Sequence, residues 1–249
     1  MHNLWYNRHA MKGLILAGGK GTRLRPATLT MNKHMVPILN KPMILYPLET
    51  LRYAGITEIM IVTGGEHVGS IAEFLGDGST YGVSLTYRVQ KDAGGIAQAL
   101  GLAKDFVGND SVLVILGDNI YENEKLPRAP LPQGVGTERA MLFLSSVKDP
   151  ERFGVPTIQD GRITEILEKP AEPKSAYAVT GLYIYPPNVF DIIATLKPSA
   201  RGELELTDVN NWYVKNNACA HHIFEGFWSD AGTPDSLKEV IDWVHSRGL

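Results

Sequence analysis

A chain of 249 residues, 44% of them hydrophobic and 20% charged, is long enough to bury one large core or two small ones. Its formal net charge of −3 provides no basic surface, which argues against a nucleic-acid partner. The longest apolar runs are far too short to cross a bilayer, so no membrane partner is expected. The single cysteine, Cys219, excludes an internal disulfide and suits a cytoplasmic protein.

The first residues of the chain and the lack of an internal linker predict its domain organisation. Residues 1–10 lack the apolar stretch of a secretory signal, and we expect them to form a leader outside the fold. Met11 is an alternative start. No repeat, low-complexity stretch or linker interrupts the remainder, so residues 11–249 are expected to form a single domain.

The first half of the chain alternates strand and helix patterns. Strands are predicted at 13–19, 58–65, 84–90 and 111–119, and helices at 41–55, 67–78 and 95–106. Residues 14–16 and 112–116 are continuous apolar runs, typical of strands buried on both faces. In the first helix we place Pro42 near the first turn and Gly55 just beyond the end. This alternation predicts βαβ units and a mostly parallel sheet covered by helices.

The second half changes character. Asp160 and Gly161 separate two strand-like runs, which predicts a hairpin over 153–170. A further strand is predicted at 178–186, and helices at 187–197, 207–216 and 234–246. Thr207 and Thr233 are the predicted N-caps of the last two helices, with Pro234 at the first helical position. Together the two halves predict an α/β fold with a mixed, mostly parallel central sheet flanked by helices.

The first predicted strand runs into a glycine-rich turn, residues 18–24. A dinucleotide fingerprint would need glycine where Leu24 stands, and a P-loop would need Ser or Thr where Gly21 stands. The remaining pattern, G-G-x-G-T-R-L, is a strand-to-turn loop whose N–H groups can surround an anion. Three cations follow closely: Arg23, Arg25 and Lys33. These cations favour a triphosphate ligand over a plain surface turn.

Polar side chains follow two other predicted strands. Asp118 and Asn119 come after a buried run, and Gln90 ends another strand. Because ligands in open α/β sheets bind outside the carboxyl ends of the strands, we expect these side chains to face the glycine-rich turn. Asp118 is a candidate Mg²⁺ ligand there, and Asp230, just before a predicted helix, is the second candidate.

Glu168 and Lys169 are adjacent at the end of the predicted hairpin. On a regular strand they would face opposite sides of the sheet. Both can reach one pocket only if the strand ends or bulges there, which the following Pro170 favours. The alternative is a solvated pair.

These segments occur in the order of one known family. The stretch "LAGGKGTRLRPAT…NKHMVPILNKPM" carries the signature G-G-x-G-T-R-L-x-P-x-T with a later K-x-x-x-P. It is followed by "GGIAQAL", "LGDNIY", "DPERFGV", "PSARGELELTDVN" and "WSDAGTPDSL". Over residues 11–245 the chain resembles the sugar-1-phosphate nucleotidyltransferases. The resemblance implies a Rossmann-like nucleotidyltransferase fold, with a nucleotide-binding part of about 11–125 and a sugar-phosphate-binding part of about 126–249.

The resemblance also implies an enzyme and its reaction. The expected step is a Mg²⁺-dependent, in-line transfer of a thymidylyl group from dTTP to α-D-glucose 1-phosphate, which gives dTDP-glucose and pyrophosphate. This is the first step of dTDP-deoxysugar synthesis, for example of dTDP-rhamnose. The alternatives are a UTP-using uridylyltransferase and a catalytically silent nucleotide-sugar sensor on the same fold.

Residue roles follow from the resemblance by position. The nucleotide is expected at Leu16, Gly18, Gly19, Gly21, Thr22, Arg23, Lys33, Gln90, Gly95 and Asp118. The sugar phosphate is expected at Asn119, Gly154, Glu168, Lys169, Val179 and Arg201. Mg²⁺ is expected at Asp118 and Asp230. The catalytic residues are expected to be Arg23, Lys33, Asp118, Lys169 and Asp230.

A homo-oligomer, dimer or tetramer, is expected as well, and two departures from the family bear on these expectations. Lys20 stands where members usually carry a small polar residue, and it either adds a phosphate contact or points to water. Longer members continue beyond the position of Leu249, which leaves the quaternary structure and control by an end product open.

Overall fold

A computed structural model describes residues 11–66, 68–127 and 138–248. The predicted leader, residues 1–10, lies outside the described residues. The strands are β1 (Met11–Ala17), β2 (Pro37–Ile38), β3 (Lys41–Pro42), β4 (Glu58–Gly64), β5 (Ser84–Gln90), β6 (Ser111–Leu116), β7 (Asn119–Tyr121), β8 (Ala140–Ser146), β9 (Gly154–Gln159), β10 (Arg162–Glu168), β11 (Tyr177–Tyr185), β12 (Cys219–Ile223) and β13 (Trp228–Asp230). The α-helices are α1 (Leu45–Tyr53), α2 (Val68–Leu75), α3 (Ile96–Gly101), α4 (Lys104–Val107), α5 (Val189–Thr195), α6 (Leu206–Lys215) and α7 (Pro234–Ser246).

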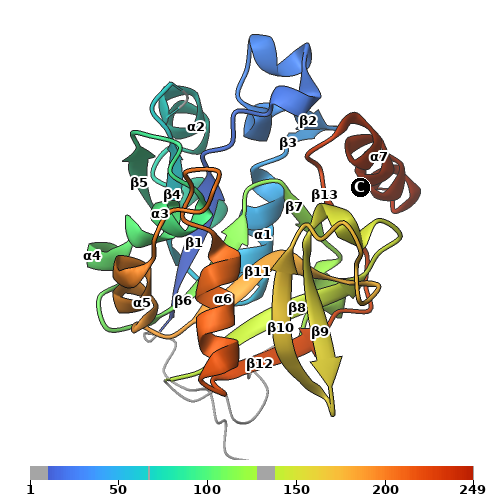
Figure 1. The fold of residues 1–249 in the computed structure, drawn as a ribbon. Helices are drawn as coiled ribbons and strands as arrows, with labels where there is room; N and C mark the ends of the chain where they lie inside the picture. The colour runs from blue at the N-terminus through green and yellow to red at the C-terminus, as the bar shows by residue number, and fades with distance from the viewer. Residues whose placement is uncertain (1–10, 67, 128–137, 249) are drawn as a thin grey trace, which may run out of the picture.

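A mixed sheet with the strand order β10-β9-β11-β6-β1-β4-β5 forms the centre of the molecule (Figure 1). The strands β6, β1, β4 and β5 are parallel, as the alternation of strands and helices predicts. The second half of the chain joins them through β11, which pairs antiparallel with β6. The α/β fold and the mixed sheet flanked by helices are therefore confirmed.

The alternation of side chains along β1 explains the two layers of helices. Leu14 and Leu16 pack in one cluster with residues of α3, α4, α5 and α6. Ile15 and Ala17 pack in a second cluster with residues of α1 and α2, because successive strand residues point to opposite faces. A third cluster packs α7 against β2 and the start of α1. The glycine-rich turn thus leaves the sheet between two covered faces.

Most predicted elements are present, with small shifts at their ends, and two predicted helices need correction. The helix predicted at 41–55 begins at Leu45, because Pro42 lies in β3 and pairs with β2. The following amides bind the preceding loop, with the Ile44 N–H donating to the His34 carbonyl (2.8 Å). The helix predicted at 95–106 divides into α3 and α4 after Gly101, which is a weak helix former.

The two predicted N-caps have different outcomes. Thr233 forms a capping box with Ser236 at the start of α7, and Pro234 is the first helical residue, as predicted. Thr207 is not an N-cap, because α6 begins one residue earlier with Glu205 at the cap position. Its hydroxyl donates instead to Glu168 Oε2 (2.6 Å). A residue expected to stabilise a helix end therefore contacts the candidate site.

Strands β7, β8 and β13 were not predicted. The sequence of β8, AMLFLSS, has no β-branched residue, and its apolar run carries no strand periodicity. β7 and β13 are three-residue strands that pair only with each other, so they give no sequence pattern of their own. Among the helices that the structure describes, none is both long and apolar enough to span a bilayer.

Candidate active site

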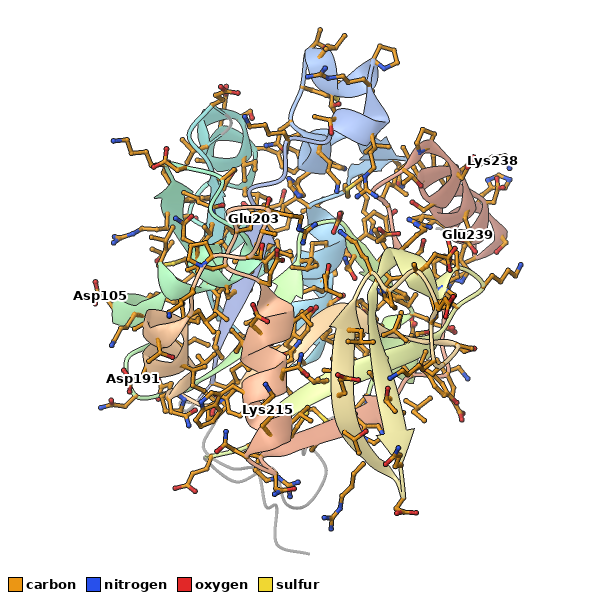
Figure 2. The ribbon with its side chains drawn as sticks, in the orientation of Figure 1. Asp105, Asp191, Glu203, Lys215, Lys238 and Glu239 are labelled. Carbon is orange, nitrogen blue, oxygen red and sulfur yellow. The ribbon has the colours of Figure 1, made fainter. Side chains whose placement is uncertain are left out.

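A cavity of about 230 Å³ opens at the carboxyl ends of β1, β5 and β6. It is lined by Leu16, Gly18, Gly19, Lys33, His34, Gln90, Ala93, Gly95, Ile96, Ala99, Leu116, Asp118 and Glu203. Figure 2 shows Glu203 over the middle of the molecule, whereas Asp105, Asp191 and Lys238 lie toward its outline. Seven of the predicted nucleotide-binding residues thus line this cavity, although they come from segments that are far apart in the sequence.

The Gln90 amide lines one end of the cavity and is held there by Gln98. Gln90 Nε2 donates to Gln98 Oε1 (2.8 Å) and to the Gly95 carbonyl (3.2 Å), and these contacts fix the orientation of its amide. The amide faces the glycine-rich turn so closely that a Cβ on Gly18 would lie 2.7 Å from Gln90 Oε1. A side chain at position 18 would therefore displace the Gln90 amide, which presents its carbonyl oxygen beside the glycine-rich turn.

Lys33 and Asp118 form an ion pair at the other end of the cavity, with Lys33 Nζ donating to Asp118 Oδ2. Both side chains are largely buried. Burial alone would raise the pKa of Asp118, but the charge and hydrogen bond of Lys33 hold it well below its usual range. Asp118 is thus an ionised carboxylate at neutral pH.

Asn119 fixes the other oxygen of Asp118, with Asn119 Nδ2 donating to Asp118 Oδ1 (2.9 Å). Its own Oδ1 accepts from the Gly181 N–H (3.0 Å) and from Trp228 Nε1 (2.7 Å). Asn119 is 2% exposed and connects β7, β11 and β13. In this structure it positions Asp118, and a contact with the sugar phosphate stays a prediction.

Three charged groups converge on Gly232, at the turn between β13 and α7. A Cβ placed on Gly232 would lie 3.2 Å from Arg23 Nη2, 3.3 Å from Asp230 Oδ2 and 3.5 Å from Asp118 Oδ2. The backbone holds this turn in place, because the Ala231 N–H donates to the Asp118 carbonyl (2.8 Å). Asp118 and Asp230, far apart in the sequence, therefore share one site, as the sequence predicted.

Burial and the neighbouring Asp118 carboxylate raise the pKa of Asp230 to about 6. Two carboxylates this close disfavour each other's charged form, so the site gains from a cation between them. Within the described residues no group of three or more His, Cys, Asp or Glu side chains could hold a metal. Two carboxylates nevertheless fit Mg²⁺, which commonly takes its other oxygens from phosphates and water.

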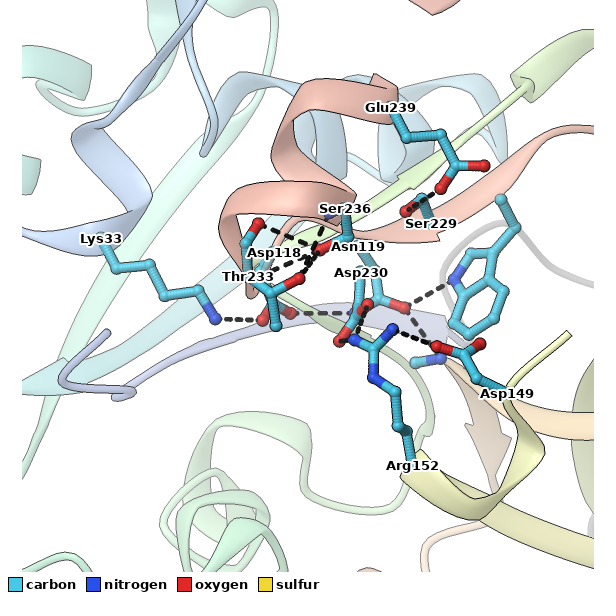
Figure 3. A network of polar contacts seen from close by, with 12 residues as sticks. Lys33, Asp118, Asn119, Asp149, Arg152, Ser229, Asp230, Thr233, Ser236 and Glu239 are labelled. Atoms are coloured by element: carbon cyan, nitrogen blue, oxygen red, sulfur yellow. Dashed lines mark hydrogen bonds and ion pairs between the residues drawn. The ribbon is translucent and has the colours of Figure 1, made fainter. Parts of the chain in front are cut away.

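Arg152 is a site residue that the sequence interpretation missed. From the end of η6 (Pro150–Arg152) its Nη1 donates to Asp149 Oδ2 (2.6 Å) and its Nη2 to Asp230 Oδ1 (3.2 Å). Figure 3 shows its guanidinium between the carboxylates of Asp149 and Asp230. Arg152 approaches Asp230 from the side that faces away from Lys33. The only sequence signal for Arg152 is its place in the quoted segment "DPERFGV".

The predicted sugar-phosphate residues form a second cluster beside the ends of β9 and β10. Glu168 Oε1 lies 3.6 Å from Lys169 Nζ and 3.8 Å from Arg201 Nη2, and Arg201 also pairs with Glu205 (2.9 Å). β10 ends at Glu168, and Lys169 has a φ of 46°, so both side chains reach one side as the following proline suggested. Gly154 pairs with Glu168 and with Val179, so five of the six predicted sugar-phosphate residues lie in this cluster and Asn119 lies beside Asp118 instead.

Tyr183 is a buried residue of β11 whose hydroxyl is influenced by carboxylates of both parts of the site. Burial raises its pKa, and the carboxylates of Glu168 and Asp118 both raise it further. The backbone also connects the two parts, because the Lys169 N–H donates to the Phe153 carbonyl (2.9 Å), next to Arg152. The Glu168–Arg201 cluster is therefore joined through the backbone to Arg152, which contacts Asp230.

The remaining predicted residues lie around the turn after β1. Gly21 accepts a hydrogen bond from the Thr28 hydroxyl (2.6 Å) and precedes η1 (Thr22–Leu24), which carries Thr22 and Arg23. Lys20 is exposed at the tip of the turn. Sequence interpretation missed Gln98, His34 and Glu203. Of these three, Gln98 was the easiest to predict from the sequence, because it lies one helical turn beyond Gly94 in the quoted segment "GGIAQAL".

Comparison with known proteins defines the class. The family model for nucleotidyl transferases matches residues 12–247. A glucose-1-phosphate thymidylyltransferase of Neisseria meningitidis is 44% identical over 95% of this chain and 83% of its own length. A low-salt glycan biosynthesis nucleotidyltransferase of Haloferax volcanii, Agl11, is 43% identical over 94% of this chain and 66% of its own length.

Solved structures agree. A Bacillus anthracis protein described as a candidate glucose-1-phosphate thymidylyltransferase, crystallised with sucrose, has a TM-score of 0.85 and 52% identity over 94% of this chain and 95% of its own. A UDP-glucose pyrophosphorylase bound to UDP-glucose has a TM-score of 0.84 and 25% identity over 95% of this chain and 99% of its own. The chain belongs to the nucleotidyl transferase family. Within this family its curated relatives at 38–44% identity include many glucose-1-phosphate thymidylyltransferases.

Proposed function

We propose that this chain transfers a thymidylyl group from dTTP to α-D-glucose 1-phosphate, giving dTDP-glucose and pyrophosphate. The observation that carries the proposal is the convergence of Arg23, Asp118 and Asp230 on Gly232. Asp118 pairs with Lys33 in the cavity. Asp230 contacts Arg152, whose neighbour Phe153 accepts the Lys169 N–H. The names of the relatives support the substrates, and dTDP-deoxysugar synthesis would use the product.

The chemistry needs positioning and charge rather than a general base, because the sugar phosphate is already an anionic nucleophile. Lys169, on the edge of the Glu168–Arg201 cluster, would hold that phosphate in line behind the α-phosphorus of the nucleotide. Arg23 would stabilise the charge on the departing pyrophosphate, and Lys33 would bind the triphosphate. Glu168, oriented by Thr207, would accept hydrogen bonds from the sugar hydroxyls.

Mg²⁺ is the cation that we propose for this site, held by Asp118 and Asp230. When bound it would neutralise phosphate charge beside the reacting phosphorus. The carboxylate pair fits this role, since Asp118 is ionised and the pKa of Asp230, raised to about 6, is still below neutral pH. Removal of Mg²⁺ with a chelator is expected to abolish turnover while leaving the fold intact.

A pyrophosphate-release assay tests the proposal. dTTP, UTP, ATP and GTP are each combined with glucose, galactose and mannose 1-phosphates in Mg²⁺ buffer. dTTP with glucose 1-phosphate is expected to give the highest kcat/KM. No release from any pair would instead support a catalytically silent nucleotide-sugar sensor.

A UTP-using enzyme is the second candidate. The likeness to a UDP-glucose pyrophosphorylase favours it, and Gln90 Oε1, which can accept from the imide N–H that thymine and uracil share, does not discriminate against it. The same assay separates the two candidates by the relative kcat/KM of dTTP and UTP.

The assembly is proposed in the same way. Residues 11–249 would act as one domain, because β11 pairs with β6 and both parts of the chain line one site. The family resemblance suggests a dimer or tetramer, which light scattering on a sizing column would measure.

A further inference from the structure

Arg152 shares its guanidinium between a carboxylate of the active site and one outside it. Nη1 donates to Asp149 Oδ2 at 2.6 Å, whereas Nη2 lies 3.2 and 3.5 Å from the two oxygens of Asp230. The Asp149 contact is the shorter and is local, three residues along the chain. The Asp230 contact is longer and joins distant segments, so it is the half of the bridge that can be exchanged.

The two carboxylates of the metal-binding pair each have a cation in this structure. Lys33 contacts Asp118, and Arg152 contacts Asp230, from opposite sides of the pair (Figure 3). Arg152 thus supplies positive charge where a divalent cation would otherwise supply it.

A divalent cation at this pair and the guanidinium on Asp230 repel each other. The next residue, Phe153, accepts the Lys169 N–H (2.9 Å), so the backbone of Arg152 is joined to that of the residue proposed to hold the sugar phosphate. Nη1 of Arg152 can stay bonded to Asp149 while Nη2 leaves Asp230 for another acceptor. An arginine fork is well suited to a phosphate oxygen.

We propose that Arg152 serves as the counter-ion of Asp230 until a divalent cation binds, and then transfers Nη2 to the phosphate of the sugar substrate. This inference rests on the proposed function for the identity of that phosphate. A bound cation would free the Arg152 guanidinium for the phosphate, and a bound phosphate would draw the guanidinium away from Asp230. Each of the two binding steps is therefore expected to strengthen the other.

The first test measures metal binding without any nucleotide or sugar phosphate. Mn²⁺ is titrated into the protein at about pH 7.5, where Asp230 is ionised, and free Mn²⁺ is followed by electron paramagnetic resonance. Arg152→Gln is expected to tighten Mn²⁺ binding roughly tenfold, since one repelling charge is removed from a few ångströms away. Arg152→Lys, which keeps the charge, is expected to stay within about twofold of the unaltered protein.

Arg247→Gln is the matched control. Arg247 also bridges two carboxylates, Glu122 (3.0 Å) and Glu124 (3.3 Å), but it does not contact Asp118 or Asp230. Its loss is expected to leave Mn²⁺ binding unchanged. If Arg152→Gln proves too unstable to titrate, Arg152→Met removes the same charge with a side chain of similar length.

The second test adds glucose 1-phosphate to the same titration. It should tighten Mn²⁺ binding in the unaltered protein and have a smaller effect in Arg152→Gln. Mn²⁺ affinity that is unchanged or weaker in folded Arg152→Gln would overturn the counter-ion role. An equal effect of glucose 1-phosphate in both proteins would overturn the transfer to phosphate. Because the first test uses no substrate, its result is independent of whether pyrophosphate release supports the proposed function.

Discussion

Asp118 and Asp230 show how strongly the surroundings decide what one kind of side chain does. Asp118 receives hydrogen bonds from Lys33 and Asn119, which together keep it ionised. Asp230 is similarly buried but has a more distant cation and a carboxylate as a neighbour, so its pKa rises to about 6. The sequence predicted both residues as metal ligands but could not predict this difference, because it depends on contacts between distant segments.

The raised pKa of Asp230 makes a prediction about pH and stability. The folded protein binds this proton more tightly than the unfolded chain, whose Asp pKa is about 3.9. The stabilisation is therefore fully present below about pH 4 and is lost as pH rises through about 6, an effect of about 3 kcal/mol. Urea unfolding of the unaltered protein and Asp230→Asn, in chelator, should show a difference in unfolding free energy that changes between pH 4.5 and 7. A difference independent of pH would contradict the raised pKa.

The Lys33–Asp118 pair makes a prediction that separates catalysis from stability. Asp118→Asn is expected to reduce kcat severely and also to lower the free energy of unfolding by about 3 kcal/mol, since the buried Lys33 ammonium loses its partner. Lys33→Met combined with Asp118→Leu should recover much of the stability but none of the activity. Chemical unfolding and the pyrophosphate-release assay measure the two effects. Near-normal turnover by folded Asp118→Asn would remove Asp118 from the mechanism.

At the scale of elements, the sequence predicted best what local pattern determines. The apolar runs of β1 and β6, and the Thr-Pro start of α7, were predictable because each is specified by neighbouring residues. The position of β8 depends instead on tertiary packing, because its apolar run has no strand periodicity. The same limit applies to the site. Charged residues at strand ends were identifiable, whereas Gln98, Arg152 and Thr207 act through contacts across the fold.

Thr207 and Thr233 provide a matched test of this distinction. Thr233 caps α7, so Thr233→Ala should lower the free energy of unfolding by about 1 kcal/mol. Thr207 donates to Glu168 and caps nothing, so Thr207→Val should leave stability within about 0.5 kcal/mol and raise KM for glucose 1-phosphate. Urea unfolding and steady-state kinetics are compared for the two variants. A loss of helix stability in Thr207→Val, with KM unchanged, would restore the N-cap interpretation.

At the scale of the whole molecule, the site depends on how the sheet joins the two halves of the chain. The nucleotide cavity is built by the parallel strands of the first half, and the Glu168–Arg201 cluster by the antiparallel strands of the second. β11 connects them, because it pairs with β6 at residues 182–185 and meets β9 at Val179, both on the edge opposite β8. The two substrates can therefore be held at a fixed distance, with the carboxylate pair at the junction.

The cavity also limits how selective the protein can be among nucleotides. The Gln90 amide can pair with an imide edge that thymine and uracil share, so the base methyl and the sugar hydroxyl must supply the discrimination. A methyl group in a fitted apolar site contributes about 1–3 kcal/mol, or roughly 10–200-fold. We therefore expect dTTP to be preferred and UTP to be a measurable second substrate. Purine triphosphates are expected to follow far behind, because their bases are larger than those of pyrimidines.

dUTP is the diagnostic substrate for this preference, because it lacks the methyl group of thymine and also lacks the 2′-hydroxyl of UTP. If the methyl group carries the selectivity, kcat/KM for dUTP should resemble that for UTP; if the hydroxyl carries it, dUTP should resemble dTTP. Parallel kcat/KM measurements with glucose 1-phosphate separate the two contributions. A kcat/KM for UTP equal to or above that for dTTP would replace the thymidylyltransferase proposal with the uridylyltransferase one, since the same cavity and cations would then serve the other pyrimidine.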